Sequence, residues 1–124
     1  MTPKSILIVE DNCDSRELLA ALLKMEGFSI LTAEDGHTGL KTAKAERPDA
    51  IITDLHMPEG DGIRMIQELR QQPDLSGIPI IAVTAYGDWN ATLAANAGAD
   101  DTIQKPINIE MLVEKMRSLL RMPE

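Results

Sequence analysis

The sequence predicts an α/β fold in which a doubly wound parallel sheet of five strands carries helices on both faces. Short, continuous apolar runs rich in Ile and Val recur along the chain, and segments with helical periodicity separate them. Glycine, proline or asparagine stands near most of the boundaries. Apolar runs of this length suit strands that are buried on both faces. Strict alternation of strands and helices implies parallel strands joined by right-handed crossovers.

The predicted strands are the apolar runs themselves, and the last is the weakest because it is short and more polar. They are expected at Ser5–Val9, Phe28–Ala33, Ala50–Thr53, Ile78–Val83 and Asp101–Gln104.

The segments between the strands place apolar residues on one helical face. Asn12 or Asp14 is positioned to cap the first helix. Gly27 is expected to end that helix in a left-handed conformation, and Gly98 to end the fourth. The first helix and the last carry the clearest apolar stripes, at Leu18, Leu19, Leu22 and Leu23 and at Ile109, Leu112, Val113, Met116, Leu119 and Leu120.

Length and composition predict one domain over residues 1–124, with no output domain. The net charge of −8 argues against a nucleic-acid-binding surface, which needs clustered Lys and Arg. Cys13 is the only cysteine, so we expect no intramolecular disulfide and a reducing compartment, the cytoplasm. There is no signal peptide and no apolar run near the ~20 residues of a membrane span, so no membrane association is expected.

Polar residues stand where the predicted strands end. Glu10 and Asp11 follow the first strand, Asp54 the third, Thr84 the fourth and Lys105 the fifth. The carboxyl ends of parallel strands share one edge of the sheet, and doubly wound folds bind ligands there. We therefore expect three carboxylates, a hydroxyl and an ammonium to meet in one crevice.

Such a cluster of acids points to metal-assisted phosphate chemistry. Packed carboxylates stay ionised only when a cation joins them; otherwise a pKa rises. Oxygen ligands without supporting Cys or His favour a hard ion, and Mg²⁺ is the usual choice with phosphates. A carboxylate beside Mg²⁺ can attack a phosphoryl group, while the ion and a lysine screen the charge. Asp54 is the expected acceptor.

Along nearly its whole length the chain resembles the receiver domain of two-component response regulators. The motifs that carry the resemblance are Glu10-Asp11-Asn12, Thr53-Asp54, Met57-Pro58, Asp61-Gly62, Val83-Thr84-Ala85, Gly98-Ala99-Asp100-Asp101 and Lys105-Pro106. Each motif alone is weak, but together, in this order, they are highly specific. The resemblance implies a flavodoxin-like (βα)5 fold with strand order 2-1-3-4-5. It also implies a stand-alone signalling domain that is no enzyme beyond catalysing its own phosphorylation and dephosphorylation.

The resemblance assigns the metal site and the acceptor. Asp54 is similar to the phosphoryl acceptor and also contacts the Mg²⁺. Asp11 resembles the direct carboxylate ligand, and Glu10 the acid that holds the ion through water. His56 stands where the family offers a backbone carbonyl to the metal, so its imidazole is not expected to be a ligand.

The remaining site residues follow in the same way. Thr84 resembles the hydroxyl that moves towards the phosphoryl group, and Lys105 the ion-pairing lysine, whose bond to Pro106 is expected to be cis. Thr102 departs from the family, which carries Tyr or Phe there, so the usual aromatic switch is in doubt. Tyr86 is a candidate to supply a ring. Bulky His56 and Tyr86 are hypothesised to slow loss of the phosphoryl group by shielding it from water.

The resemblance also implies partners, and three alternatives stay open. The donor is expected to be a histidine kinase or histidine phosphotransfer protein, with a downstream protein target, and the domain a monomer or weak homodimer. Thr102 keeps open a degenerate receiver that binds partners without phosphorylation. A dehalogenase-type phosphatase would carry a second Asp where this chain has His56. A flavin-binding domain would carry a phosphate loop in place of Glu10-Asp11-Asn12.

Overall fold

The computed structural model describes residues 2–55, 57, 61–85 and 87–122, with the backbone alone described at Asp61 and at residues 87–90. Strands and helices alternate strictly along this part of the chain. The strands are β1 (Ser5–Val9), β2 (Ser29–Ala33), β3 (Ala50–Asp54), β4 (Ile80–Thr84) and β5 (Asp101–Gln104). The helices are α1 (Cys13–Met25), α2 (Gly36–Glu46), α3 (Asp61–Gln71), α4 (Gly87–Ala97) and α5 (Ile109–Leu119).

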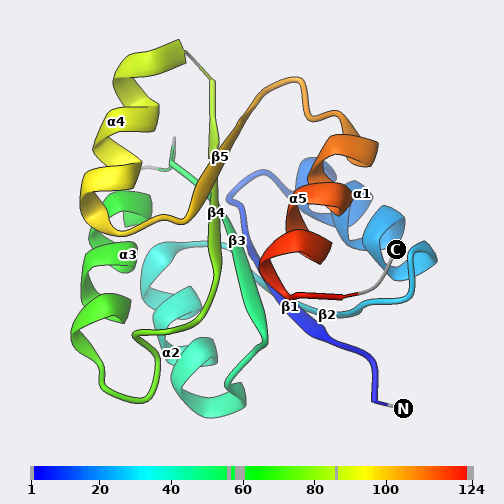
Figure 1. The fold of residues 1–124 in the computed structure, drawn as a ribbon, viewed down its shortest axis with the longest axis horizontal. Coiled ribbons are helices and arrows are strands. Elements are labelled where there is room, and N and C mark those ends of the chain that lie inside the picture. Colours follow the sequence, from blue (N-terminus) through cyan, green and yellow to red (C-terminus); the bar gives the residue numbers. More distant parts are fainter. Residues whose placement is uncertain (1, 56, 58–60, 86, 123–124) are drawn as a thin grey trace.

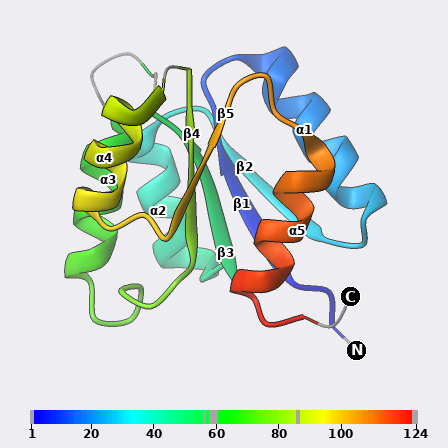
Figure 2. The same ribbon diagram turned by 45° about the horizontal axis from the view of Figure 1, so that its top comes forward.

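The five strands form one parallel sheet in the order β2-β1-β3-β4-β5. Helices α1 and α5 cover one face, and α2, α3 and α4 cover the other (Figures 1 and 2). The predicted fold class, the parallel pairing and the strand order 2-1-3-4-5 are confirmed.

The sheet separates two hydrophobic cores, which explains why its strands show no polar alternation. Along β1, Ile6 and Ile8 enter the core under α1 and α5, whereas Leu7 and Val9 enter the core under the other three helices. All four side chains are at most 1% exposed. A strand buried on both faces needs apolar residues at consecutive positions.

Two helix boundaries follow the expected chemistry. The side chain of Asn12 accepts a hydrogen bond from the Ser15 N–H at 2.9 Å, so Asn12 and not Asp14 caps α1. Gly27 and Gly98 have φ angles of +97° and +123°, the left-handed conformation that ends a helix at little steric cost.

Two strands begin later than predicted. The backbone N–H groups of Phe28 and Ile78 donate to Leu23 and Leu75 in the preceding turns, and not to a neighbouring strand. Strands β2 and β4 therefore start at Ser29 and Ile80.

Leu18 departs from the predicted stripe of α1, since its side chain is 63% exposed. Among the described residues, each helix is either too short or too polar to cross a membrane.

Candidate functional site

The carboxyl ends of β1 and β3 bring two carboxylates together beneath the surface. Asp54 is the last residue of β3 and is 4% exposed, and Glu10 follows β1 directly and is 7% exposed. The Glu10 N–H donates to the Ala33 carbonyl at 3.0 Å, which extends the β1–β2 ladder to this residue. The position of both acids is thus fixed by sheet hydrogen bonding.

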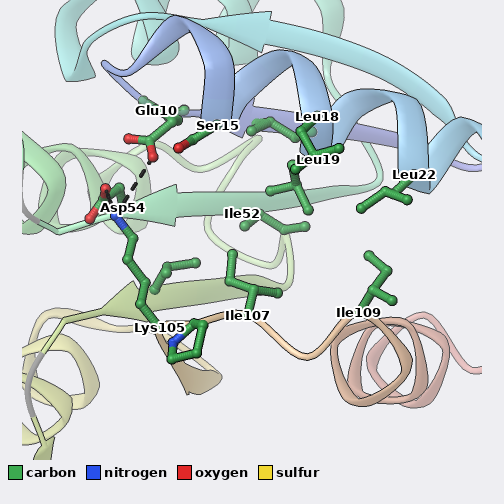
Figure 3. A pocket seen from close by; sticks show the side chains of 14 residues that line it. Glu10, Ser15, Leu18, Leu19, Leu22, Ile52, Asp54, Lys105, Ile107 and Ile109 are labelled. Carbon is green, nitrogen blue, oxygen red and sulfur yellow. Dashed lines mark hydrogen bonds and ion pairs between the residues drawn. The ribbon is translucent and has the colours of Figure 1, made fainter.

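Lys105, whose side chain is 38% exposed, forms ion pairs with these two buried acids. Its Nζ lies 2.7 Å from Asp54 Oδ2 and 3.6 Å from Glu10 Oε1 (Figure 3). The Lys105 N–H donates to the Thr84 carbonyl at 2.8 Å, so β5 pairing carries the lysine to this edge. The Lys105–Pro106 peptide bond is cis, as expected. Burial opposes the ammonium charge, but hydrogen bonds and attraction from Asp54 and Glu10 outweigh it and raise the Lys105 pKa.

Three carboxylates converge on one point of this cluster. Glu10, Asp11 and Asp54 each present an oxygen, and these oxygens lie within 4.8 Å of one another. Burial, followed by a hydrogen bond to Asp54 and repulsion from it, raises the pKa of Glu10 to about 7, although Lys105 pulls it down. The ammonium of Lys105 alone therefore does not offset the burial and repulsion that disfavour the ionised form of Glu10.

The donor set fits a hard divalent cation. Glu10 Oε2 is fully buried and has no hydrogen-bond partner among the described residues. A buried carboxylate oxygen without a donor is costly, and a cation or its water removes that cost. The three acids offer only oxygen, which suits Mg²⁺ and not a soft metal.

Thr84 ends β4 beside the acids, and its side chain is 1% exposed. Within the described part of the chain, its Oγ1 makes no hydrogen bond. A buried hydroxyl without a partner is unusual in a native structure. It is therefore available to a group that enters the site.

Two residues hold the loops of the site in place. Arg16 Nη1 donates to the Glu10 carbonyl at 2.8 Å and so ties the β1–α1 loop to α1. Gly62 lies against the end of β3, where an added Cβ would stand 2.5 Å from the Asp54 carbonyl oxygen. The sequence motifs include Gly62 but do not reveal this approach. Arg16 belongs to none of the sequence motifs, so the sequence did not indicate its role in the site.

Some predicted positions stay untested. His56 and Tyr86 lie outside the described residues, so the carbonyl ligand, the substitute ring and the shielding effect remain predictions. Thr102 lies on β5 opposite Ala82 and is partly buried. A hollow on this side of the molecule is lined by Thr102 together with Ala91 and Ala95 of α4.

Fold and site together define a flavodoxin-like α/β domain with an acidic pocket at the carboxyl edge of its sheet. The family model for the response regulator receiver domain matches residues 6–117. The chain is 38% identical over 120 residues to the response regulator MprA of Mycolicibacterium vanbaalenii, covering 96% of this chain and 51% of that protein. It spans about half the length of the curated relatives it matches.

Solved structures give the same result. The chemotaxis response regulator CheY4 of Vibrio cholerae superimposes with a TM-score of 0.88 at 28% identity, covering 95% of this chain and 99% of that one. A CheY-like receiver domain protein from Methanospirillum hungatei gives a TM-score of 0.88 at 29% identity, covering 97% and 95%.

The chain belongs to the response regulator receiver domain family. It is a two-component signalling module and not a true enzyme, and receivers of this kind pair with histidine kinases.

Proposed function

We propose that this domain accepts a phosphoryl group from a phosphohistidine donor onto Asp54, in a Mg²⁺-dependent reaction. The observation that carries the proposal is the environment of the Asp54 carboxylate. One of its oxygens is held 2.7 Å from an ammonium, and two further acids lie within reach of a shared cation. In the reaction an Asp54 oxygen attacks phosphorus, the P–N bond breaks, and the donor imidazole leaves with its electron pair.

The residues of the site have separate roles in this transfer. Lys105 orients the Asp54 carboxylate and offers its ammonium to the transferring oxygens. The Thr84 hydroxyl, which lacks a partner among the described residues, is free to hydrogen-bond a phosphoryl oxygen once one is present. Asp11, Asp54 and the His56 carbonyl would hold Mg²⁺ directly and Glu10 would hold it through water. When bound, the ion would supply electrostatic stabilisation of the phosphoryl charge.

We infer that the donor is a histidine kinase or a histidine phosphotransfer protein and that the compartment is the cytoplasm. The modified domain signals through phosphorylation-dependent protein contacts or passes the group along a phosphorelay. The alternative is a degenerate receiver that binds partners without modification. The complete set of acids, Thr84 and Lys105 favours phosphorylation, whereas Thr102 leaves the readout open.

The test is incubation with acetyl phosphate and Mg²⁺, read by intact mass spectrometry. We expect one added phosphoryl group, absent without Mg²⁺ and absent in Asp54→Ala. Asp74→Ala is the matched control, because Asp74 is 71% exposed and its only described partner is Arg47. It should be modified like the parent protein. A folded, Mg²⁺-supplied protein that gains no phosphoryl group would favour the degenerate receiver.

A further inference from the structure

A cavity of about 360 Å³ lies between α1 and α5 and opens beside the acidic site. Its volume falls within the roughly 300–1,000 Å³ of small-molecule sites. Figure 3 shows leucines of α1 facing isoleucines of the β5–α5 segment across it. The apolar residues that form its walls and floor are Leu18, Leu19, Leu22, Ile52, Ile107 and Ile109.

Elsewhere, α1 and α5 are joined by residues that do not line the cavity. Arg117 of α5 donates to the Glu26 carbonyl at the end of α1 at 3.3 Å, and its guanidinium lies 5.8 Å from the centre of the Phe28 ring. Leu18 lines the cavity and is 63% exposed, so the cavity is open to solvent at this residue. The cavity is thus an apolar slot with Glu10, Asp54 and Lys105 at one end (Figure 3).

The polar end holds more acidic than basic side chains. Glu10, Asp54 and Lys105 line it, which gives two carboxylates for one ammonium. The ammonium already contacts both acids, at 3.6 and 2.7 Å. A cationic head is attracted to this end, whereas an anionic head meets two carboxylates.

We propose that this cavity binds small cationic amphiphiles. The apolar body lies between α1 and α5, and an ammonium or amidinium head lies at Glu10 and Asp54. The head and a divalent cation would bind the same carboxylates. Each ligand therefore lowers the affinity of the protein for the other. Inhibition of phosphorylation by such a ligand rests on the proposed function, but binding itself does not.

Octylammonium is the probe, compared with octanol and octanoate in Mg²⁺-free buffer. Methyl NMR spectra of the Leu and Ile side chains report on the cavity. We expect saturable shifts at Leu22 and Ile109, with octylammonium binding about tenfold more tightly than octanoate. Octanoate binding as tightly, or no saturable shift with octylammonium, would overturn the proposal. So would shifts that grow with protein concentration without probe, because they assign the cavity to a second copy of the chain.

Two substitutions on α1 separate the cavity from general charge effects. Leu18→Lys places a cation on a residue that lines the cavity and is already 63% exposed, so the fold tolerates it. This substitution should lower the affinity for octylammonium about tenfold. Met25→Lys makes the same charge change at an 82% exposed residue outside the cavity and should leave affinity unchanged. Equal effects of both variants would contradict the placement.

Competition with the metal tests the position of the head. Saturating Mg²⁺ should lower the affinity for octylammonium about tenfold. Independent binding of the two ligands would overturn the placement of the head at Glu10 and Asp54. No phosphodonor is present in these titrations. Phosphorylation without octylammonium binding therefore rejects this inference alone, and binding without phosphorylation rejects the proposed function alone.

Discussion

At the scale of the residue, Thr84 has a side chain that disfavours the folded state of the unmodified domain. Its hydroxyl is buried, and within the described residues it has no hydrogen-bond partner. A buried polar group in this state costs about 1–3 kcal/mol relative to a satisfied one. Such a residue is expected where a ligand or a modification later supplies the missing bond.

Thr84→Val should therefore stabilise the unmodified domain. The substitution keeps the shape of the side chain and removes the unsatisfied hydroxyl, so we expect a gain of about 1 kcal/mol in the free energy of unfolding. Urea denaturation measures it. Thr53→Val is the control, because the Thr53 hydroxyl donates to the Asp54 carbonyl at 3.1 Å and its loss should destabilise. Equal destabilisation by both variants would show that Thr84 is satisfied in solution.

At the scale of elements, the approach of α3 to β3 limits which residue can stand second in the helix, at Gly62. A Cβ on Gly62 would stand 2.5 Å from the Asp54 carbonyl oxygen and 2.9 Å from Leu55 Cα. Both atoms belong to the backbone, which cannot move aside as the end of a side chain can. The close packing that results holds the strand end that carries the acceptor.

Gly62→Ala should destabilise the domain by about 1–3 kcal/mol, because the helix and the strand must separate. The same separation displaces the Asp54 carboxylate, so modification by acetyl phosphate should slow as well. Gly77→Ala is the matched control, since an added Cβ there meets no atom within 4 Å. It should change stability by less than about 0.5 kcal/mol. Equal stability of the two variants would contradict the packing described.

The start of α2 depends on one carboxylate. Asp35 accepts a hydrogen bond from the Thr38 N–H at 2.7 Å, and this bond lowers the pKa of Asp35 below its ordinary value of 3.8. A folded-state pKa below the unfolded value means that the stabilisation is present above pH 4 or so. It is lost as the pH falls through the folded-state pKa.

Asp35→Ala should lower stability by about 0.5–1 kcal/mol at pH 7, at the low end for a cap because water partly screens this half-buried site. The deficit should shrink as the pH falls below the ordinary pKa of Asp. Asp35→Asn keeps an acceptor without a titrating group and should lie close to the parent protein at pH 7. Chemical denaturation across the acid range measures all three proteins. A deficit that stays constant with pH would exclude the charged cap.

At the scale of the whole molecule, Arg70 ties four segments together. From α3 it donates to the carbonyls of Gly98, Ser76 and Ile78 and to the Asp100 carboxylate, at 2.7–2.9 Å. Its side chain is only 20% exposed. The end of α4, the connection into β4 and the start of β5 therefore share one guanidinium.

Arg70→Met should cost about 2–3 kcal/mol, because three carbonyls lose this donor and the Asp100 carboxylate keeps, among the described residues, the Ile80 N–H alone. Arg64→Met on the same helix is the matched control, since Arg64 is 76% exposed and its only described contact is Glu68 at 3.7 Å. It should cost less than about 0.5 kcal/mol. Thermal unfolding compares the two, and similar losses would show that the Arg70 contacts add nothing beyond an ordinary surface arginine.

The sequence predicts the order of elements and the site acids for one reason. In a parallel α/β fold, the strand ends are visible as the limits of apolar runs, and the topology brings those ends together. Glu10, Asp54 and Lys105 could be placed before any coordinates. The contacts of Arg16 and Arg70 could not, because a long flexible side chain reaches partners that no local pattern specifies. The gap between α1 and α5 was hidden for a similar reason, since helical periodicity does not report the distance between two helices.

The proposed acceptor of the phosphoryl group is the carboxylate of Asp54. Borohydride reduces an aspartyl phosphate to homoserine, so treatment after acetyl phosphate and Mg²⁺ marks the acceptor for peptide sequencing by mass spectrometry. We expect homoserine at position 54 and unchanged aspartate at position 11, with no conversion when Mg²⁺ is left out. Conversion at another acid, or none in folded protein supplied with Mg²⁺, would contradict it.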